Sequence, residues 1–183
     1  MKFNHGCILV LFMSIFASCT VNEKQEVKVS ERNILVNDAL YTIKGICYHP
    51  VPKGSANKRD FSNLKEDILL MKEAEINTIR VYAPIEEKEV LNTLAANNIK
   101  VIIGFGYDQN GYYDIVSGTF IDYVNKFKNH KAILMWELGN EYNYHPEWFD
   151  GNLKNWYKAL NNAAALIHQN DPNHPVTTAH GDL

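Results

Sequence analysis

Apolar and polar positions begin to follow regular spacings at about residue 33. A short apolar segment at residues 34–36 is followed by Asn37 and Asp38, which are typical of a tight turn, and a second apolar stretch begins at Leu40. The pattern predicts a β-hairpin that leads into a first strand at residues 43–48. A loop rich in Pro, Gly and Lys then connects this strand to the next segment.

The rest of the chain alternates short apolar runs with segments of helical spacing. In the first helical segment Leu64, Ile68 and Met71 lie three or four positions apart, and similar patterns follow each later run. The later apolar runs lie at residues 78–82, 101–103, 133–136 and 175–178. Because these runs are continuous and do not alternate with polar residues, they predict a parallel sheet with helices on at least one face.

Two architectures fit such a sheet, a (β/α)8 TIM barrel and a doubly wound open sheet. No glycine-rich phosphate-binding motif follows the first strand, which removes the main sequence support for a dinucleotide-binding sheet. Polar and aromatic residues instead gather where strands end, as catalytic groups do in barrels. They are His49, Arg80, Tyr82, Tyr107, Asp108, Asn140, Glu141 and His180. We therefore predict an α/β protein of the TIM-barrel class.

The predicted barrel is incomplete. A barrel of this class takes about 250 residues, whereas residues 33–183 supply about four and a half β/α units after the hairpin. We expect this segment to be the N-terminal half of a barrel. A half barrel would leave strand edges and helix faces uncovered unless another segment pairs with it.

The N-terminus carries an export pattern. Lys2 precedes an apolar run at residues 7–17 that is too short to span a bilayer. Residues 16–19, Phe-Ala-Ser-Cys, resemble the lipobox of bacterial lipoproteins, which implies a signal peptide at residues 1–18 and lipidation of Cys19. Residues 19–32 are then expected to be a polar tether to a membrane of the bacterial cell envelope. An ordinary signal peptide with a chance cysteine is the alternative.

Charge and cysteine content narrow the possible partners. The net charge of −3 comes without a basic stripe, so nothing indicates nucleic acid binding. With Cys7 in the signal peptide and Cys19 lipidated, only Cys47 remains, and we expect it to be a small buried side chain. The seven histidines show no metal-ligand spacing, so we expect neither a metal nor another cofactor.

A motif at residues 136–141, Trp-Glu-Leu-Gly-Asn-Glu, strongly resembles the strand-four signature of clan A glycoside hydrolases. Supporting segments lie in the same order at residues 43–45, 77–80 and 132–136. Over residues 40–183 the chain looks most like the catalytic barrel domain of glycoside hydrolase family 2. Residues 77–83 also resemble β-glucanosyltransferases.

The resemblance implies roles for individual residues. Glu141 would be the general acid/base, Asn140 would bind a sugar hydroxyl, and Arg80 would orient the nucleophile. That nucleophile is a glutamate at the end of strand seven in the family, which this chain does not reach. Arg80 as a structural ion-pair partner is the alternative.

Glu137 is a poor candidate for the second catalytic carboxylate. It lies four residues before Glu141 in the predicted strand and has the same parity, so the two α-carbons would be about 13 Å apart. Retaining glycosidases need carboxyl groups about 5 Å apart. We expect Glu137 to be buried and satisfied by a basic or hydroxyl neighbour.

These residues lead to a functional hypothesis. The chain is expected to belong to a retaining O-glycosidase for β-linked poly- or oligosaccharides, with this segment inactive by itself. Substrate contacts are expected from His49, Tyr82, Tyr142, Trp148 and His180, because aromatic rings can stack on sugars. The alternatives are a glucanosyltransferase-type transglycosylase and a non-catalytic glycan-binding lipoprotein that lacks the nucleophile.

Overall fold

The computed structural model describes residues 24–56, 58–106 and 111–182. The expected signal peptide at residues 1–18 and the lipidation site Cys19 lie outside these residues, as do Tyr107 and Asp108. None of the helices in the described part of the chain is both long and apolar enough to cross a bilayer.

A small antiparallel sheet forms first, with strand order β1-β2-β3. Its strands are β1 (Val27–Ser30), β2 (Asn33–Val36) and β3 (Ala39–Tyr41), and the predicted hairpin is β2 and β3. The predicted tether at residues 19–32 is wrong for residues 27–30, which form β1. Val27 is only 3% exposed. In residues 27–30 the apolar Val27 and Val29 alternate with the polar Lys28 and Ser30, which is a strand pattern.

The main sheet is parallel, as predicted. Its strand order is β4-β5-β6-β7-β8, and each strand pairs in parallel with the next. The strands are β4 (Gly45–Cys47), β5 (Thr78–Val81), β6 (Lys100–Phe105), β7 (Ile133–Asn140) and β8 (Val176–Ala179). The connecting helices are α1 (Leu64–Glu73), α2 (Lys88–Ala96), α3 (Ile121–Phe127) and α4 (Leu153–Asn170). Two 3-10 turns, Tyr142–Tyr144 and Pro146–Phe149, lie between β7 and α4.

The strand order follows the chain order without a reversal. A doubly wound sheet reverses its order at a switch point, so the arrangement is consistent with part of a barrel. The described strands form an open sheet in which β4 and β8 are the edge strands. The α/β class is therefore confirmed, and closure into a barrel stays a prediction.

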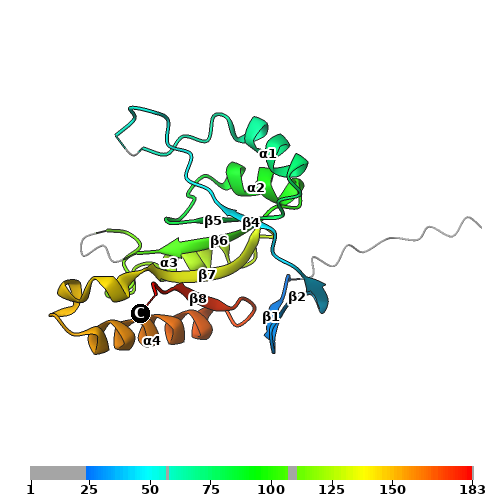
Figure 1. Ribbon diagram of the computed structural model, residues 1–183. Helices are drawn as coiled ribbons and strands as arrows, with labels where there is room; N and C mark the ends of the chain where they lie inside the picture. The colour runs from blue at the N-terminus through cyan, green and yellow to red at the C-terminus, as the bar shows by residue number, and fades with distance from the viewer. Residues whose placement is uncertain (1–23, 57, 107–110, 183) are drawn as a thin grey trace, which may run out of the picture.

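The hydrophobic core lies between the parallel sheet and the helices. Alternate residues of β5, β6 and β7 point toward the helices, and Ile79, Ile103 and Trp136 are fully buried there. The small sheet joins the N-terminal ends of the parallel strands, where the backbone N–H of Val27 donates to the carbonyl oxygen of Asn173 at 2.7 Å. It therefore lies at the opposite end of the parallel sheet from the β7–α4 connection (Figure 1).

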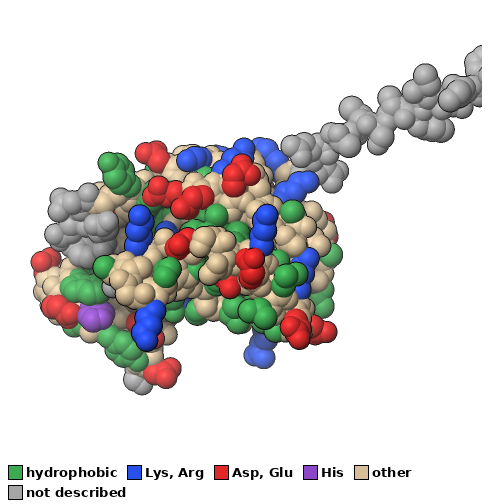
Figure 2. Space-filling model, turned by 90° about the horizontal axis from the view of Figure 1, so that it is seen from above, with side chains coloured by type: hydrophobic (Ala, Val, Ile, Leu, Met, Phe, Trp, Pro, Cys, Tyr) green, Lys and Arg blue, Asp and Glu red, His purple; other side chains and the backbone are tan. Residues whose placement is uncertain are grey.

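Figure 2 shows a face on which Lys and Arg side chains are interspersed with Asp and Glu. Apolar side chains lie between these charged groups. The mixture agrees with the small net charge of −3. This face carries no extended field of one sign that would attract a polyanion.

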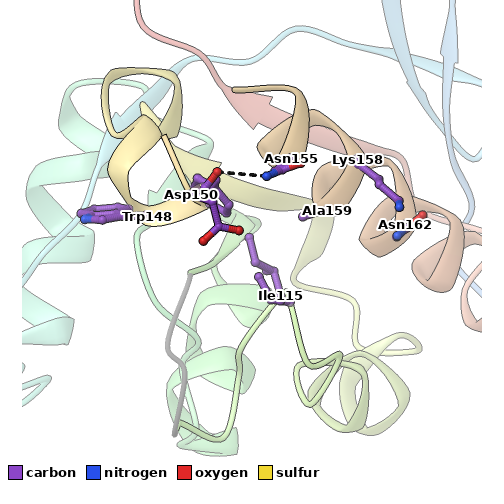
Figure 3. A pocket seen from close by; sticks show the side chains of 9 residues that line it. Ile115, Trp148, Asp150, Asn155, Lys158, Ala159 and Asn162 are labelled. Atoms are coloured by element: carbon purple, nitrogen blue, oxygen red, sulfur yellow. Dashed lines mark hydrogen bonds between the residues drawn. The ribbon is translucent and has the colours of Figure 1, made fainter. Parts of the chain in front are cut away.

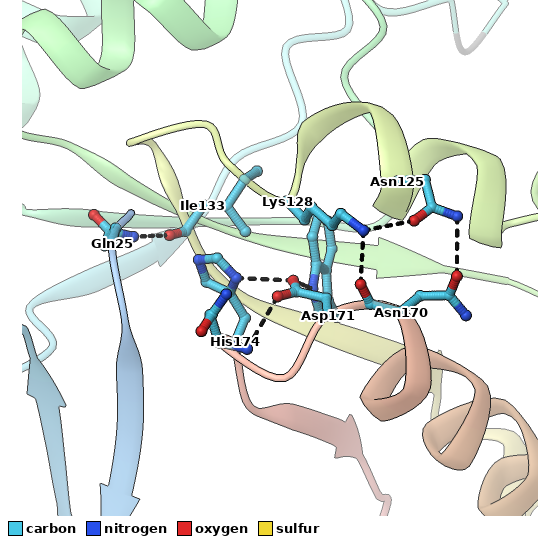
Figure 4. Close-up of polar contacts among 9 residues, drawn as sticks. Gln25, Asn125, Lys128, Ile133, Asn170, Asp171 and His174 are labelled. Atoms are coloured by element: carbon cyan, nitrogen blue, oxygen red, sulfur yellow. Dashed lines mark hydrogen bonds and ion pairs between the residues drawn. The ribbon is translucent and has the colours of Figure 1, made fainter. Parts of the chain in front are cut away.

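A buried polar cluster joins the end of α4 to β7 (Figure 4). Trp136 Nε1–H donates to Asp171 Oδ2 at 2.7 Å, and His174 Nδ1 lies 2.8 Å from the same oxygen. Burial by itself would raise the pKa of Asp171, but the hydrogen bonds and charge of His174, with the bonds from Trp136 and the Asn173 backbone, lower it. The cluster therefore stabilises the ionised carboxylate inside the core.

We expect the substitution Asp171→Asn to lower the free energy of unfolding by about 2 kcal/mol at pH 7, because charge-assisted hydrogen bonds are lost. A lowered folded-state pKa means that the carboxylate stabilises the fold above its unfolded pKa of about 4. This contribution disappears as the pH falls through the folded pKa. Urea unfolding between pH 7 and pH 3 should therefore show the variant and the parent protein converging in acid.

The exposed carboxylate of Asp182 offers a control, and Asp182→Asn should leave stability nearly unchanged. A destabilisation by Asp171→Asn that stays the same down to pH 3 would contradict the buried-carboxylate account.

Candidate active site

Arg80 on β5 is the centre of a polar network at the parallel sheet. Its Nε and Nη2 atoms donate to the two carboxylate oxygens of Glu137 at 2.7 and 2.6 Å, and Nη2 also donates to Asn140 Oδ1 at 2.7 Å. The Arg80 and Glu137 side chains are 18% and 6% exposed. The expected basic neighbour of Glu137 is confirmed. The hydrogen bond to Glu137 raises the pKa of Arg80 against the opposing effect of burial.

A β-bulge in β7 brings Glu137 and Asn140 to the same side of the sheet. Glu137 pairs with Thr177 and Asn140 pairs with Ala179, so three steps along β7 oppose two steps along β8. In a regular strand, residues three positions apart point to opposite faces. The extra residue of the bulge turns Asn140 to the same face as Glu137, so both side chains reach Arg80.

Gly139 is the residue at which this bulge is possible. Its φ is +74°, in the left-handed region that glycine adopts without a steric penalty. A Cβ at this position would lie 2.7 Å from Trp156 Cη2 and 3.0 Å from Tyr142 Cδ2. Both the backbone conformation and the packing therefore require glycine.

Glu141 follows the last residue of β7 and leaves the strand direction. Its backbone has a φ of +56°, and its N–H donates to the carbonyl oxygen of Ala179 at 2.7 Å. The expectation that Glu141 shares the strand parity of Glu137 is wrong, because the bulge and the left-handed turn intervene. Its side chain is exposed. Left-handed conformations of non-glycine residues are uncommon and concentrate at functional sites.

Two predicted contact residues lie beside Arg80. The guanidinium carbon of Arg80 is 4.6 Å from the centre of the Tyr82 ring. The His49 ring meets the edge of Tyr82 at a centroid distance of 6.2 Å. His49 and Tyr82 are both exposed. The structure therefore brings His49, Arg80 and Tyr82 together at the ends of β4 and β5.

Cys47 also belongs to this group, although the sequence analysis expected it to be buried. The thiol is exposed and lies 3.6 Å from Arg80 Nη1. Hydrogen bonds from the Tyr82 hydroxyl and from Arg80 lower the pKa of the Cys47 thiol. Cys47 pairs in register with Arg80 across β4 and β5. Aligning the two predicted strands as parallel neighbours would have placed Cys47 beside Arg80.

An aromatic cluster follows Glu141 in the β7–α4 connection. The Tyr142 ring contacts Trp148 edge-on at a centroid distance of 5.2 Å and Trp156 at 5.0 Å. His145, which the sequence analysis did not select, stacks on Trp148 at 4.1 Å. Trp148 is 41% exposed. Tyr142 and Trp148 therefore lie together in this connection.

His180 lies with α4 rather than with Arg80. Its Nε2 atom is 3.1 Å from the hydroxyl oxygen of Tyr157, and the two rings stack at 6.0 Å. Both side chains are exposed. Tyr157 was not predicted, because the helical pattern identifies buried positions and does not distinguish between exposed ones. Within the described residues, no group of three or more His, Cys, Asp or Glu side chains could hold a metal ion.

The fold is similar to those of known glycoside hydrolases. A β-glucuronidase of Faecalibacterium prausnitzii superposes with a TM-score of 0.70 and 21% identity, covering 87% of this chain and 28% of its own. A family 2 β-galacturonidase from Eisenbergiella tayi has a TM-score of 0.65 and 23% identity, with coverages of 85% and 28%. β-Glucuronidase 2 of Bacteroides uniformis has a TM-score of 0.65 and 18% identity, with coverages of 85% and 20%.

These similarities concern the fold. No protein-family model matches the sequence, and the search of curated proteins finds no match either. The chain spans less than a third of the length of each of the three enzymes. What the chain shares with these enzymes is therefore a similar fold over most of its own length.

The substitution Glu137→Gln should lower the free energy of unfolding by about 3 kcal/mol, since it leaves the largely buried Arg80 without its counter-charge. Chemical denaturation at neutral pH measures the effect. The exposed pair of His145 and Glu147 gives a matched control, because Glu147→Gln should cost less than about 1 kcal/mol. Equal losses for the two variants would show that the Arg80–Glu137 pair contributes no more than a surface contact.

Proposed function

We propose that this chain is the acid/base-bearing part of a retaining glycoside hydrolase for β-linked sugars. Glu141 is the general acid/base in this proposal. The observation that carries it is the position of Glu141 directly after Asn140, whose side chain is held by Arg80 at the end of β7. In barrels of parallel strands, catalytic groups lie at the carboxyl ends of the strands, which is where this polar network lies.

The hydrogen bonds of Asn140 suggest how it acts. Its Oδ1 accepts a hydrogen bond from Arg80, so the amide NH2 is the group that it can offer to a ligand. An NH2 donor suits a sugar hydroxyl, which accepts hydrogen bonds through its oxygen. Arg80 in turn is held by Glu137. Arg80 and Glu137 are therefore positioning residues in the proposal.

A retaining reaction needs a second carboxylate, which attacks the anomeric carbon while Glu141 protonates the leaving oxygen. Glu137 does not suit this role, because both of its oxygens accept hydrogen bonds from Arg80. The proposal assigns the nucleophile to a segment other than the five described strands. The Bacteroides uniformis enzyme is covalently bound to cyclophellitol-6-carboxylate aziridine, which supports a covalent route in this fold.

The substrate is proposed to be a β-linked oligo- or polysaccharide. The similar structures include β-glucuronidases and a β-galacturonidase, so aryl β-glucuronides and β-galacturonides are the first substrates to test. Transfer to a sugar acceptor in place of water would use the same groups. Attachment to the bacterial cell envelope through Cys19 is proposed from the lipobox resemblance alone.

Glycan binding without cleavage is a second candidate. Both oxygens of Glu137 accept hydrogen bonds from Arg80, so this carboxylate is not available as a nucleophile, and glycan binding needs none. The two candidates differ in one measurable respect. Only the enzyme releases a reducing sugar from a β-linked substrate.

Glu141→Gln in the full-length protein should lower kcat/KM by about 10²- to 10⁴-fold for aryl β-glycosides with poor leaving groups. Substrates with strongly acidic phenols need no protonation when the bond breaks, so their glycosylation step should be much less affected. Steady-state rates across a series of phenol pKa values measure this difference. A flat response across the series would contradict the role of Glu141 as general acid.

Glu147→Gln serves as the control, because Glu147 is an exposed glutamate in the same connection. It should leave the rates within about twofold of the parent. Hydrolysis that is absent from the parent protein, together with retained glycan binding, would favour the second candidate.

A further inference from the structure

A second concave site lies beside the β7–α4 connection (Figure 3). It has a volume of about 420 Å³ and lies between α4, the segment from Trp148 to Asp150, and the β6–α3 connection. The volume falls within the range of about 300–1,000 Å³ that is typical of small-ligand pockets. None of the residues around Arg80 lines it.

One part of this pocket is apolar. Ile115 is almost completely buried, whereas Val116 and Trp148 are 54% and 41% exposed. Ala159 of α4 completes the apolar wall. His145 stacks on the Trp148 ring, so the apolar contacts offered to a ligand come from the side chains of Ile115, Val116 and Ala159. Aliphatic groups of this kind can pack against the C–H groups of a sugar ring.

The other part is polar and comes mainly from one face of α4. Asn155, Lys158 and Asn162 line the pocket together with Asp150. The three helical residues have the i, i+3 and i+7 spacing of a single helix face. They supply amide and ammonium donors, and Asp150 supplies a carboxylate acceptor. Such groups suit the hydroxyl edge of a sugar.

The loop that carries this polar group is held in place. Asp150 has a φ of +55° and Gly151 a φ of +71°, so the chain turns sharply between Phe149 and α4. Asn155 Nδ2 donates to the carbonyl oxygen of Phe149 at 3.1 Å, which ties this turn to the first turn of α4 (Figure 3). Pocket walls that are fixed before binding reduce the entropy lost when a ligand binds.

We propose that this pocket binds a sugar residue of a neutral glycan. The carboxylate of Asp150 and the ammonium group of Lys158 have opposite charges, so the pocket carries no net charge that would favour an ionic sugar. The inference goes beyond the reaction proposed above, because binding here requires no bond cleavage. It therefore stands or fails separately from the role of Glu141.

The test measures binding of cellotetraose, laminaritetraose and mannotetraose to the Glu141→Gln protein by titration calorimetry. At least one of these neutral tetrasaccharides should bind at millimolar concentration. Asn162→Ala and Lys158→Ala should each weaken that binding about three- to tenfold through loss of a hydrogen bond. Ala159→Phe should abolish it by filling the pocket. All three positions are on α4, where alanine and phenylalanine keep the helix.

Asn161→Ala is the matched control, because Asn161 is exposed on α4 and does not line the pocket. Its affinity should equal that of the parent. Circular dichroism should show the same helix content in every variant. The proposal is overturned if none of the three tetrasaccharides binds, if Ala159→Phe binds as well as the parent, or if tetragalacturonate binds more tightly than the neutral glycans.

Discussion

The burial of Arg80 is the constraint on which the rest of this site depends. A guanidinium that is largely removed from water must have its charge and its donors satisfied. Glu137 meets most of this requirement with two hydrogen bonds, and Asn140 accepts a third. Because both acceptors are on β7, the backbone of that strand must present two side chains that a regular strand would point to opposite faces.

The bulge at Gly139 meets this requirement and links the site to α4. A side chain at Gly139 would collide with Trp156, which is 1% exposed and belongs to the core. The close approach of α4 therefore depends on the same glycine that allows Asn140 to reach Arg80. The geometry at the end of β7 is thus determined by helix packing on one face and by an ion pair on the other.

The spacing of apolar residues predicted the secondary structure well and the local irregularities poorly. Continuous apolar runs identified the parallel strands, although only β7 of the described strands is buried on both faces along nearly its whole length. Strand β1 was missed because Lys28 and its neighbours gave the segment a polar composition, although Val27 is buried. Cys47 was predicted to be buried from its apolar neighbours, yet β4 is an edge strand and the thiol is exposed.

Only part of the candidate site was predicted, because the sequence does not show where a strand departs from regular geometry. The motif at residues 136–141 located Asn140 and Glu141, and the packing argument correctly gave Glu137 a basic neighbour. The prediction that Glu137 and Glu141 point to the same face failed at the bulge, because an extra residue in one strand breaks the alternation of side chains between the two faces. His180 was grouped with Arg80 because it follows a strand end, but its ring stacks on Tyr157 of α4. Position along a strand does not specify the direction of a side chain beyond its end.

The left-handed turn at Glu141 connects the ion-pair network to the aromatic cluster. Such a conformation costs about 1–3 kcal/mol and persists only where surrounding contacts hold it. Here the N–H of Glu141 donates to Ala179 of β8, and its carbonyl oxygen accepts from the N–H of Tyr144. The turn directs Tyr142 onto Trp156 and Trp148. The backbone at residues 139–142 therefore sets both the position of Asn140 beside Arg80 and the course of the aromatic segment over α4, so the two groups of side chains form one structural unit.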